Sequence, residues 1–220
     1  MKIQGNKILV LLFILTIMFS ICACGPKVKK EKTAQELYSD GIQYYEAEKY
    51  RTAIESFNRL KDWYPFSQYV VEAELKIADS HFYLIEYIDA VFAYESFEKL
   101  HPTHEKCDYV LFQIGKCYIK QLDTIDRDQS PAYKAVEYFS RLITEHPNSQ
   151  YINSAKEYII KCYQNIMSHE FYIGKFYLKN KFYQAALNRF TKIVSDFPDL
   201  GLHQKAIEQI QFCKKSLEKP

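Results

Sequence analysis

The sequence predicts an all-α protein, a solenoid of about four to five helical hairpins that ends in an unpaired C-terminal capping helix. Alanines recur at four places, each followed by an aromatic residue after four positions and by a proline after twelve: Ala53, Phe57, Pro65; Ala90, Tyr94, Pro102; Ala135, Phe139, Pro147; Ala186, Phe190, Pro198. A small residue, Gly41, Ala78 or Gly174, stands twelve residues before three of these alanines. No stretch of the body alternates apolar and polar residues as a strand does.

This spacing is that of the tetratricopeptide repeat, a helix-turn-helix unit of about 34 residues. In such a unit the small residue lets the two helices approach, and the aromatic side chain fills the space beneath it. The proline ends the second helix, because it cannot continue the ladder of backbone hydrogen bonds. Four units in register are a much stronger signal than one.

Residues 1–23 are predicted to be a lipoprotein signal peptide. Lys2 and Lys7 give a positive start, and residues 8–21 are apolar apart from Thr16 and Ser20, a length typical of a signal-peptide core and short for a membrane span. The alternative is an ordinary secretory peptide that is cleaved nearby.

The apolar run ends in Ile21-Cys22-Ala23-Cys24, which resembles a bacterial lipobox. We therefore expect Cys24 to begin the mature chain and to carry covalent lipid, such as palmitate, as a membrane anchor. Gly25, rather than aspartate, follows Cys24. This favours the outer membrane of a Gram-negative bacterium, with the protein on its periplasmic face. Residues 24–32 are predicted to form a solvated, lysine-rich tether. The alternative is that these lysines contact anionic lipid headgroups.

The first two units are expected in residues 33–104. Thr33 and Glu36 fit a capping box, so a helix should begin there, and a second helix should carry Ala53. Ser67 is the expected N-cap of a helix over residues 69–83, and residues 90–100 should form its partner.

The third unit is assigned to residues 105–149 and departs from the pattern. Its first helix should cover residues 107–121 with Gly115 at the packing position, but twenty residues separate Gly115 from Ala135. An inserted loop over residues 122–130 accounts for the difference, with Ser130 as N-cap and Pro131 as first helical residue.

The remaining C-terminal units and the capping helix fill residues 150–220. Ser149 should cap one long helix over about residues 151–178. A helix over residues 182–196 follows it, and a last helix over about residues 202–216 has no hairpin partner, so it is expected to close the stack.

The sequence offers little for catalysis, and we predict no enzyme, no cofactor besides the lipid, and no metal. Cys107, Cys117, Cys162 and Cys213 are expected as small apolar fillers, with a disulfide such as Cys117 to Cys162 as the minor alternative. His101 and His104 share a turn without a third ligand in register. Without Lys2 and Lys7 the chain has 27 basic and 27 acidic residues, a balance that does not favour nucleic-acid binding.

A stack of hairpins presents a concave groove lined by the first helix of each unit. Counting from the packing residue gives nine expected groove positions: Tyr38, Ile42, Tyr45, Leu75, Asp79, Phe82, Tyr109, Phe112 and Lys116. This mostly aromatic lining suits an extended peptide with an apolar or aromatic end. The alternative is that several of these residues belong to the core.

A set of segments resembles the BamD (ComL/YfiO) family of outer-membrane assembly lipoproteins. They are Tyr64-Pro65-Phe66, Leu100-His101-Pro102-Thr103-His104, Asp108-Tyr109-Val110, Gly115, Arg127-Asp128-Gln129, Pro147-Asn148-Ser149-Gln150-Tyr151, His169-Glu170 and Asn188-Arg189-Phe190. The resemblance covers essentially the whole mature chain. The family commonly has one more C-terminal helix, so contacts of the far C-terminus are not carried over.

The resemblance implies a non-catalytic subunit of the β-barrel assembly (BAM) complex that promotes insertion of unfolded outer-membrane β-barrel proteins. The N-terminal repeats would receive these clients, and the C-terminal repeats would dock on a POTRA domain of BamA. It places docking at Arg189 and at the third-unit insertion, where Arg127 and Asp128 lie. Further BAM lipoproteins remain open as partners. The alternative is a periplasmic repeat lipoprotein that scaffolds peptidoglycan or cell-division enzymes.

Overall fold

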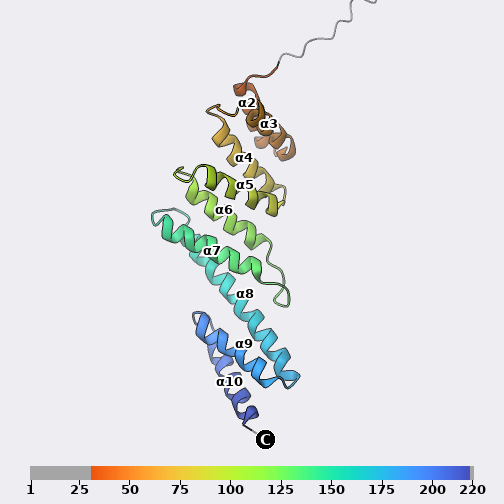
Figure 1. Ribbon diagram of the computed structural model, residues 1–220, viewed down its shortest axis with the longest axis vertical. Coiled ribbons are helices and arrows are strands. Elements are labelled where there is room, and N and C mark those ends of the chain that lie inside the picture. Colours follow the sequence, from red (N-terminus) through yellow and green to blue (C-terminus); the bar gives the residue numbers. More distant parts are fainter. Residues whose placement is uncertain (1–30, 219–220) are drawn as a thin grey trace, which may run out of the picture. The chain divides into compact units, whose positions relative to one another are not determined.

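The computed structural model describes residues 31–218, and all regular structure in this range is α-helical (Figure 1). The helices are α2 (Ala34–Glu46), α3 (Tyr50–Trp63), α4 (Val70–Tyr83), α5 (Tyr87–Leu100), α6 (Cys107–Lys120), α7 (Ser130–Glu145), α8 (Ile152–Lys179), α9 (Tyr183–Asp196) and α10 (His203–Leu217). The predicted all-α class is confirmed. The signal peptide, Cys24 and most of the predicted tether lie outside the described residues. None of the described helices is both long and apolar enough to cross a membrane.

Each helix packs on the next one in the sequence, so the hairpins follow one another along the chain (Figure 1). The long helix α8 packs on α7 and on α9, and it therefore belongs to two successive hairpins. The final helix α10 packs on α9, in the position expected of a cap. This arrangement is the predicted solenoid.

The packing residues of the repeat behave as the spacing predicts. A Cβ atom on the glycine would lie under 3 Å from a ring carbon in three pairs: Gly41 with Phe57 (2.3 Å), Gly115 with Phe139 (2.5 Å) and Gly174 with Phe190 (2.6 Å). In the second unit these places hold Ala78 and Tyr94, and the Tyr94 hydroxyl donates a hydrogen bond to Asp79 at 2.6 Å. In three units the aromatic ring thus lies too close to the glycine for a Cβ atom there. The second unit has an alanine at this position, and its aromatic residue, Tyr94, forms a hydrogen bond with Asp79.

The short turns between the helices of three units each contain one residue in the left-handed backbone conformation. Glu48, Ile85 and Lys181 have φ values of 57°, 65° and 61°, and each lies five residues before its repeat alanine. A left-handed residue at this point reverses the chain within a few positions. The third unit has its inserted loop here instead.

The predicted N-caps are one or two residues out of place. Ser67 and Ser149 lie two residues before the cap positions, which Tyr69 and Tyr151 occupy. Each serine Oγ accepts a hydrogen bond from the N–H of the tyrosine that follows, at 3.4 and 3.2 Å. The serines therefore shape the turn that leads into the helix, and they satisfy no helical N–H.

Ser130 is likewise not an N-cap. It is the first residue of α7, so Pro131 is the second. The Asp128 carboxylate accepts hydrogen bonds from the Ser130 N–H at 3.1 Å and from its hydroxyl at 2.9 Å. The acceptor at this helix start is thus Asp128, to which the sequence analysis gave only a docking role.

The inserted loop is fastened to α8 through one buried side chain. Gln129 is 4 % exposed, and its Nε2 donates to the carbonyl oxygens of Thr124 and Arg127 at 3.2 and 3.0 Å. Its Oε1 accepts from Asn165 Nδ2 of α8 at 2.5 Å. A second link runs from His169 Nδ1 to the carbonyl of Ile125 at 2.6 Å. The loop is therefore an ordered part of the third unit.

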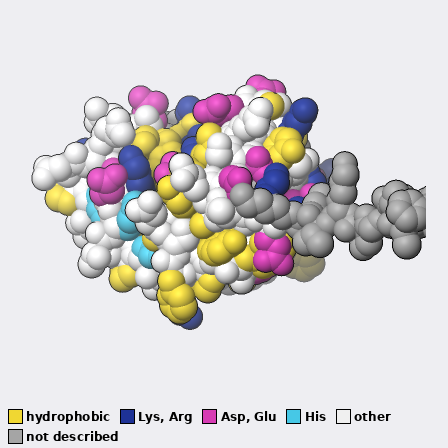
Figure 2. Space-filling model, turned by 90° about the horizontal axis from the view of Figure 1, so that it is seen from above, with side chains coloured by type: hydrophobic (Ala, Val, Ile, Leu, Met, Phe, Trp, Pro, Cys, Tyr) yellow, Lys and Arg dark blue, Asp and Glu magenta, His cyan; other side chains and the backbone are white. Residues whose placement is uncertain are grey.

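Two hydrophobic clusters share helix α4. Ala73 and Ile77 pack with residues of α2 and α3, whereas Leu75 and Ala78 pack with the cluster that continues through α10. Large apolar side chains are also exposed at several separate places, and Figure 2 shows hydrophobic side chains scattered over the face seen there. Several large apolar side chains of the described residues therefore lie outside the buried core.

Candidate functional site

Three of the nine predicted groove residues line one pocket between α2 and α4. Tyr38, Ile42 and Tyr45 are half-buried, and the pocket has a volume of about 520 Å³. Its other lining residues come from both helices and the preceding turn: Gln35, Ser39, Glu46, Tyr69, Glu72 and Lys76. Three helix A residues of the first unit therefore line a hollow, and their role in peptide binding stays a prediction.

The walls of this pocket are aromatic and carry charge. Tyr38 stacks on Tyr69 with ring centroids 4.8 Å apart and planes 17° apart. Lys76 Nζ lies 4.4 Å from the centroid of the Tyr45 ring, within the range of a cation–π contact. Burial, together with a hydrogen bond to Glu72, raises the pKa of Tyr38, so its hydroxyl stays neutral. Such a wall offers stacking surface, hydrogen-bonding groups and one cation.

Two predicted groove residues of α4 lie beneath the surface. Leu75 is 9 % and Asp79 is 4 % exposed. Asp79 Oδ1 accepts hydrogen bonds from the hydroxyls of Tyr94 at 2.6 Å and Tyr109 at 2.7 Å. Burial raises the pKa of Asp79, although both hydroxyls and the nearby lysines Lys76 and Lys116 act to lower it. Asp79 thus joins α4, α5 and α6 below the groove.

The α6 side of the groove repeats the aromatic wall. Phe112 stacks on Tyr151 with centroids 4.6 Å apart and planes 16° apart. Lys116 Nζ lies 4.9 Å from the Phe82 centroid and 5.7 Å from that of Phe112. Burial lowers the pKa of Lys116. The remaining four predicted residues, Phe82, Tyr109, Phe112 and Lys116, are therefore half-buried members of one aromatic cluster around a cation.

Sequence reasoning missed the stacking tyrosines, Tyr69 and Tyr151, and the wall residue Lys76. The segments Pro65–Tyr69 and Pro147–Tyr151 share the pattern Pro-x-Ser-Gln-Tyr. In both places the tyrosine stacks on the residue three positions before the packing glycine of the preceding helix A. This repeated pattern is the signal that could have found the two tyrosines.

Gln113 was also missed, and it has unusual hydrogen bonding. Its Nε2 donates to the Tyr109 hydroxyl at 2.6 Å, which continues the chain of hydrogen bonds from Asp79. Its Oε1 is buried and has no partner in the described part of the chain. The network around Asp79 therefore includes one unmet acceptor.

The predicted docking residues are tied to neighbouring positions of α8. Arg127 and Asp128 are exposed in the inserted loop, which His169 holds from α8. Arg189 of α9 donates through Nη1 to Oε2 of Glu170 at 2.9 Å. His169 and Glu170 are consecutive, so the structure brings the loop and Arg189 to one point on α8.

Arg189 is paired with a buried acid and shares it with Lys192. The Glu170 side chain is 4 % exposed, and Lys192 Nζ lies 2.7 Å from its Oε1. Burial acts to raise the pKa of Glu170, but the hydrogen bonds of Lys192 and Arg189 outweigh it, so the pKa is lowered. Glu170 is therefore an ionised contact between α8 and α9.

His101 and His104 contact different groups. His101 Nε2 lies 2.7 Å from Glu74 Oε2, whereas His104 Nδ1 accepts a hydrogen bond from the backbone N–H of Lys106 at 3.1 Å. Their ring centroids are 6.4 Å apart. Each histidine thus has a separate structural partner.

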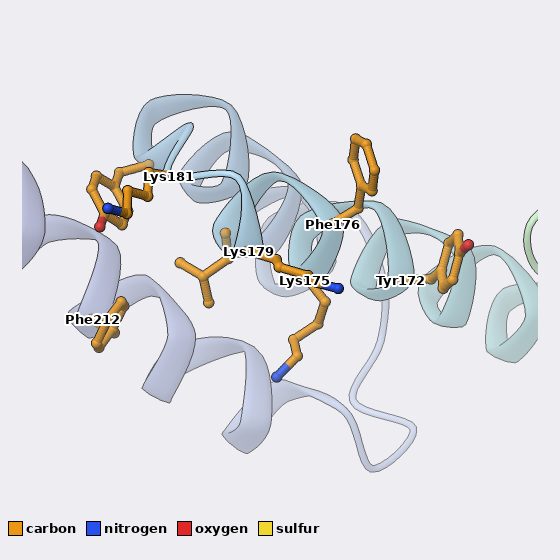
Figure 3. A pocket seen from close by; sticks show the side chains of 8 residues that line it. Tyr172, Lys175, Phe176, Lys179, Lys181 and Phe212 are labelled. Carbon is orange, nitrogen blue, oxygen red and sulfur yellow. The ribbon is translucent and has the colours of Figure 1, made fainter.

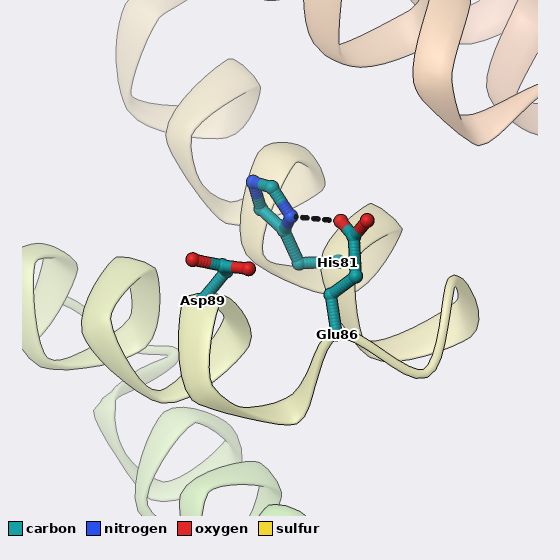
Figure 4. A group of neighbouring side chains, drawn as sticks. All are labelled: His81, Glu86 and Asp89. Atoms are coloured by element: carbon teal, nitrogen blue, oxygen red, sulfur yellow. Dashed lines mark hydrogen bonds and ion pairs between the residues drawn. The ribbon is translucent and has the colours of Figure 1, made fainter.

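A different trio, His81, Glu86 and Asp89, has ligand atoms within 4.8 Å of one another (Figure 4). His81 Nδ1 lies 2.8 Å from Glu86 Oε2, and the Arg51 guanidinium also bonds the Glu86 carboxylate. These partners lower the pKa of Glu86, the His81 hydrogen bond most strongly. A guanidinium on the same carboxylate repels a metal cation, so the trio is better explained as an ion-pair cluster between α3, α4 and the α5 start.

The four cysteines of the described region are buried free thiols. The alternative of a disulfide between Cys117 and Cys162 is therefore not formed in this structure. Burial raises the pKa of both thiols to about 12, which keeps them protonated and unreactive. They pack as the small apolar fillers that the sequence predicted.

Comparison with known proteins assigns the chain to a family over most of its length. The family described as YfiO, outer membrane lipoprotein, matches residues 30–219. The chain is similar to the outer membrane protein assembly factor BamD of Vibrio cholerae, with 27% identity over 207 residues, 90% of this chain and 86% of the relative. BamD of Rickettsia prowazekii is 30% identical over 161 residues, 73% of this chain and 64% of that protein. Among solved structures, the TPR2AB domain of yeast Sti1 is 16% identical with a TM-score of 0.45, over 84% of this chain and 71% of that one.

Proposed function

The chain belongs to the YfiO family of outer membrane lipoproteins, and we propose that it is a non-catalytic subunit of the outer-membrane β-barrel assembly complex. In this role it binds BamA and unfolded outer-membrane protein clients and promotes their insertion. The relatives named above as assembly factors support the role. The observation that carries it in this chain is the aromatic pocket between α2 and α4, because binding clients needs a surface and no reaction chemistry.

The proposed location is the periplasmic face of the outer membrane. Lipid on Cys24, which lies outside the described residues, would supply the anchor. The residues from Gly25 to Thr33 would then separate the anchor from α2. Mass spectrometry of the mature protein tests this, since the first tryptic peptide should carry the mass of the acyl chains, and an unmodified Cys24 would contradict it.

Client capture is proposed to rest on stacking. An extended segment that ends in an aromatic residue can place its ring against Tyr38 or Tyr45, where wall residues are already half-desolvated. Lys76 is the cation of the same wall that a client carboxylate would meet. The Phe112 and Tyr151 stack offers a second surface of the same kind farther along the groove.

The client site is tested with a fluorescent peptide that copies the last strand of an outer-membrane β-barrel. Tyr38→Ala should weaken its binding about tenfold, as expected for loss of a central aromatic contact. Phe92→Ala is the matched control, because Phe92 is 72 % exposed on α5 and lies outside the groove. Equal losses in both variants would show that the pocket between α2 and α4 is not the client site.

The BamA contact is tested by co-purification from detergent-solubilised membranes. Arg127→Glu is the first variant, because Arg127 is exposed and its side chain makes no hydrogen bond or ion pair in the described region. Arg59→Glu on α3 is the control with the same charge change. We expect less BamA with Arg127→Glu and unchanged BamA with Arg59→Glu. Recovery of peptidoglycan or cell-division enzymes without BamA would replace this function with the scaffolding alternative.

A further inference from the structure

A second hollow lies at the far end of α8, away from the groove residues. It has a volume of about 640 Å³ and is formed by the last turns of α8, the turn to α9, and α10. Figure 3 shows Tyr172 and Phe176 on α8 and Phe212 on α10, with Lys175 and Lys179 on the stretch between them. Neither the client groove nor the proposed BamA contact uses these residues.

The lining of this hollow is aromatic and open to solvent. Tyr172, Phe176 and Phe212 are 46 %, 56 % and 53 % exposed. Tyr183 meets Phe212 edge to face, with centroids 6.4 Å apart and planes 62° apart. Half-exposed rings on two helices leave aromatic faces free for a partner. Burying these faces would be favourable, because large apolar side chains are less stable in water than in a buried contact.

Packing within the chain does not explain these residues. Tyr172, Lys175, Phe176 and Lys179 follow the spacing i, i+3, i+4 and i+7, so they form one stripe along α8. The contact with α9 uses another face, where Glu170 binds Arg189 and a Cβ on Gly174 would lie 2.6 Å from Phe190. The stripe is therefore additional to the face that holds the hairpin together.

The charge of the hollow is positive and uncompensated. Lys175, Lys179 and Lys181 line it, no acidic residue does, and none of the three forms an ion pair within the described residues. By contrast, Arg189 and Lys192, on the other side of the hairpin, both form ion pairs with Glu170. Residues 171–218 contain eight Lys and Arg against four Asp and Glu, whereas residues 34–104 contain six against thirteen. The surroundings of the hollow thus attract anions.

We propose that this hollow binds an acidic segment of a partner protein, in which carboxylates flank one aromatic or large aliphatic side chain. The apolar side chain would lie between Phe176 and Phe212, and the carboxylates would pair with Lys175, Lys179 and Lys181. A concave site between two helices favours an inserted segment over a lipid surface, for which the rings would project from one face. Aromatic burial supplies affinity, and the lysines supply orientation and association rate.

The test uses the full-length mature chain and a fluorescent ten-residue peptide with four aspartates around one phenylalanine. Lys175→Glu with Lys179→Glu should weaken binding at least about tenfold, because two attractions become repulsions. Lys156→Glu with Lys205→Glu makes the same charge change at exposed residues of α8 and α10 outside the hollow, and it should have little effect. Phe212→Ala should also weaken binding, while circular dichroism remains unchanged.

Three outcomes would overturn the proposal. The first is equal binding of a peptide with asparagines in place of aspartates, which would remove the role of charge. The second is binding to phosphatidylglycerol vesicles that depends on Lys175 and Lys179 when the peptide does not bind, which would assign the site to a membrane. The third is self-association, seen by sedimentation, that the same lysine variants abolish without any peptide binding. Peptide affinity that depends on both the lysines and Phe212 would support the proposal whether or not the α2–α4 pocket binds clients.

Discussion

Asp79 on α4 and Glu170 on α8 are both buried carboxylates, 4 % and 3 % exposed, and they behave in opposite ways. Neutral tyrosine hydroxyls surround Asp79, and burial raises its pKa. Arg189 and Lys192 bind Glu170 directly, and its pKa is lowered in spite of burial. Two carboxylates with nearly the same exposure thus have pKa shifts in opposite directions, because different groups contact them.

Cys162 shows how burial alone changes the pKa of a side chain. It is fully buried, no charged group acts on it, and burial alone raises its pKa to about 12. Asp79 follows Cys162 in direction, because the two hydroxyls, Lys76 at 3.9 Å and Lys116 only partly offset the loss of water. Glu170 departs from it, because two cations at hydrogen-bond distance more than replace that water. Asp79 is therefore held mainly by tyrosine hydroxyls, whereas Glu170 is held by two cations at hydrogen-bond distance.

The largest effect that would test this comparison is expected from Arg189→Glu. The variant places a second carboxylate beside the buried Glu170, and the free energy of unfolding should fall by about 3 kcal/mol after allowance for the partial exposure of Arg189. Urea unfolding measures the change. Arg189→Lys, which keeps a cation there, is the control and should lose less than half as much. A loss below about 1 kcal/mol would show that Glu170 does not need Arg189.

A smaller effect is expected from Tyr94→Phe in the other region. It removes one of the two hydroxyl donors to Asp79 and should lower the free energy of unfolding by about 1–2 kcal/mol. Tyr44→Phe is the matched control, since Tyr44 is half-buried on α2 and lies outside the Asp79 cluster. If both substitutions have the same effect, the hydrogen bond to Asp79 does not stabilise the fold.

The pH dependence of the two carboxylates should have opposite signs. The stability difference between wild type and Asp79→Asn is most favourable to wild type below about pH 3.9, and it declines as the pH rises through the raised pKa of Asp79. The difference between wild type and Glu170→Gln is present above about pH 4.3 and is lost as the pH falls through the lowered pKa of Glu170. Urea unfolding from about pH 3 to pH 7 gives both curves, and parallel curves would contradict the comparison.

The smallest effect concerns Cys162, the reference for burial without partners. With a pKa of about 12 and no exposure, its thiol should react with iodoacetamide at least about a thousandfold more slowly in native protein than in urea. Peptide mapping by mass spectrometry follows the alkylation. Rapid native labelling would mean that the core around α8 opens often, and burial could then not explain the raised pKa.

The repeat arithmetic predicted the fold well, because it records steric contacts that recur. Gly41, Gly115 and Gly174 each lie against the aromatic ring that the spacing assigns to them, and the helix ends lie within one to three residues of the expected positions. The groove was predicted in part. Tyr38, Ile42 and Tyr45 line a pocket, whereas Leu75 and Asp79 are buried below it.

The remaining features depend on contacts between residues far apart in the sequence. No residue near Asp79 in the sequence indicates that Tyr94 and Tyr109 will donate hydrogen bonds to it. In the sequence, Arg189 likewise resembles a solvent-facing residue, and nothing there indicates its contact with Glu170. The N-caps were misplaced because serine and threonine stabilise turns as well as helix starts, and only the backbone geometry tells the two apart. The hollow near Phe212 requires three helices to meet, which no single motif encodes.

The 28 residues of α8 also set a length. At 1.5 Å per residue the helix measures about 42 Å, and it begins directly after Tyr151 and ends at Lys179. A single extended chain reaching from the aromatic stack at one end to the lysines at the other would need about 12 to 13 residues, since each residue advances at most about 3.4 Å. If both proposed surfaces bind segments, the length of the unbroken helix sets how long one segment must be to reach both, and a shorter segment would occupy only one of them.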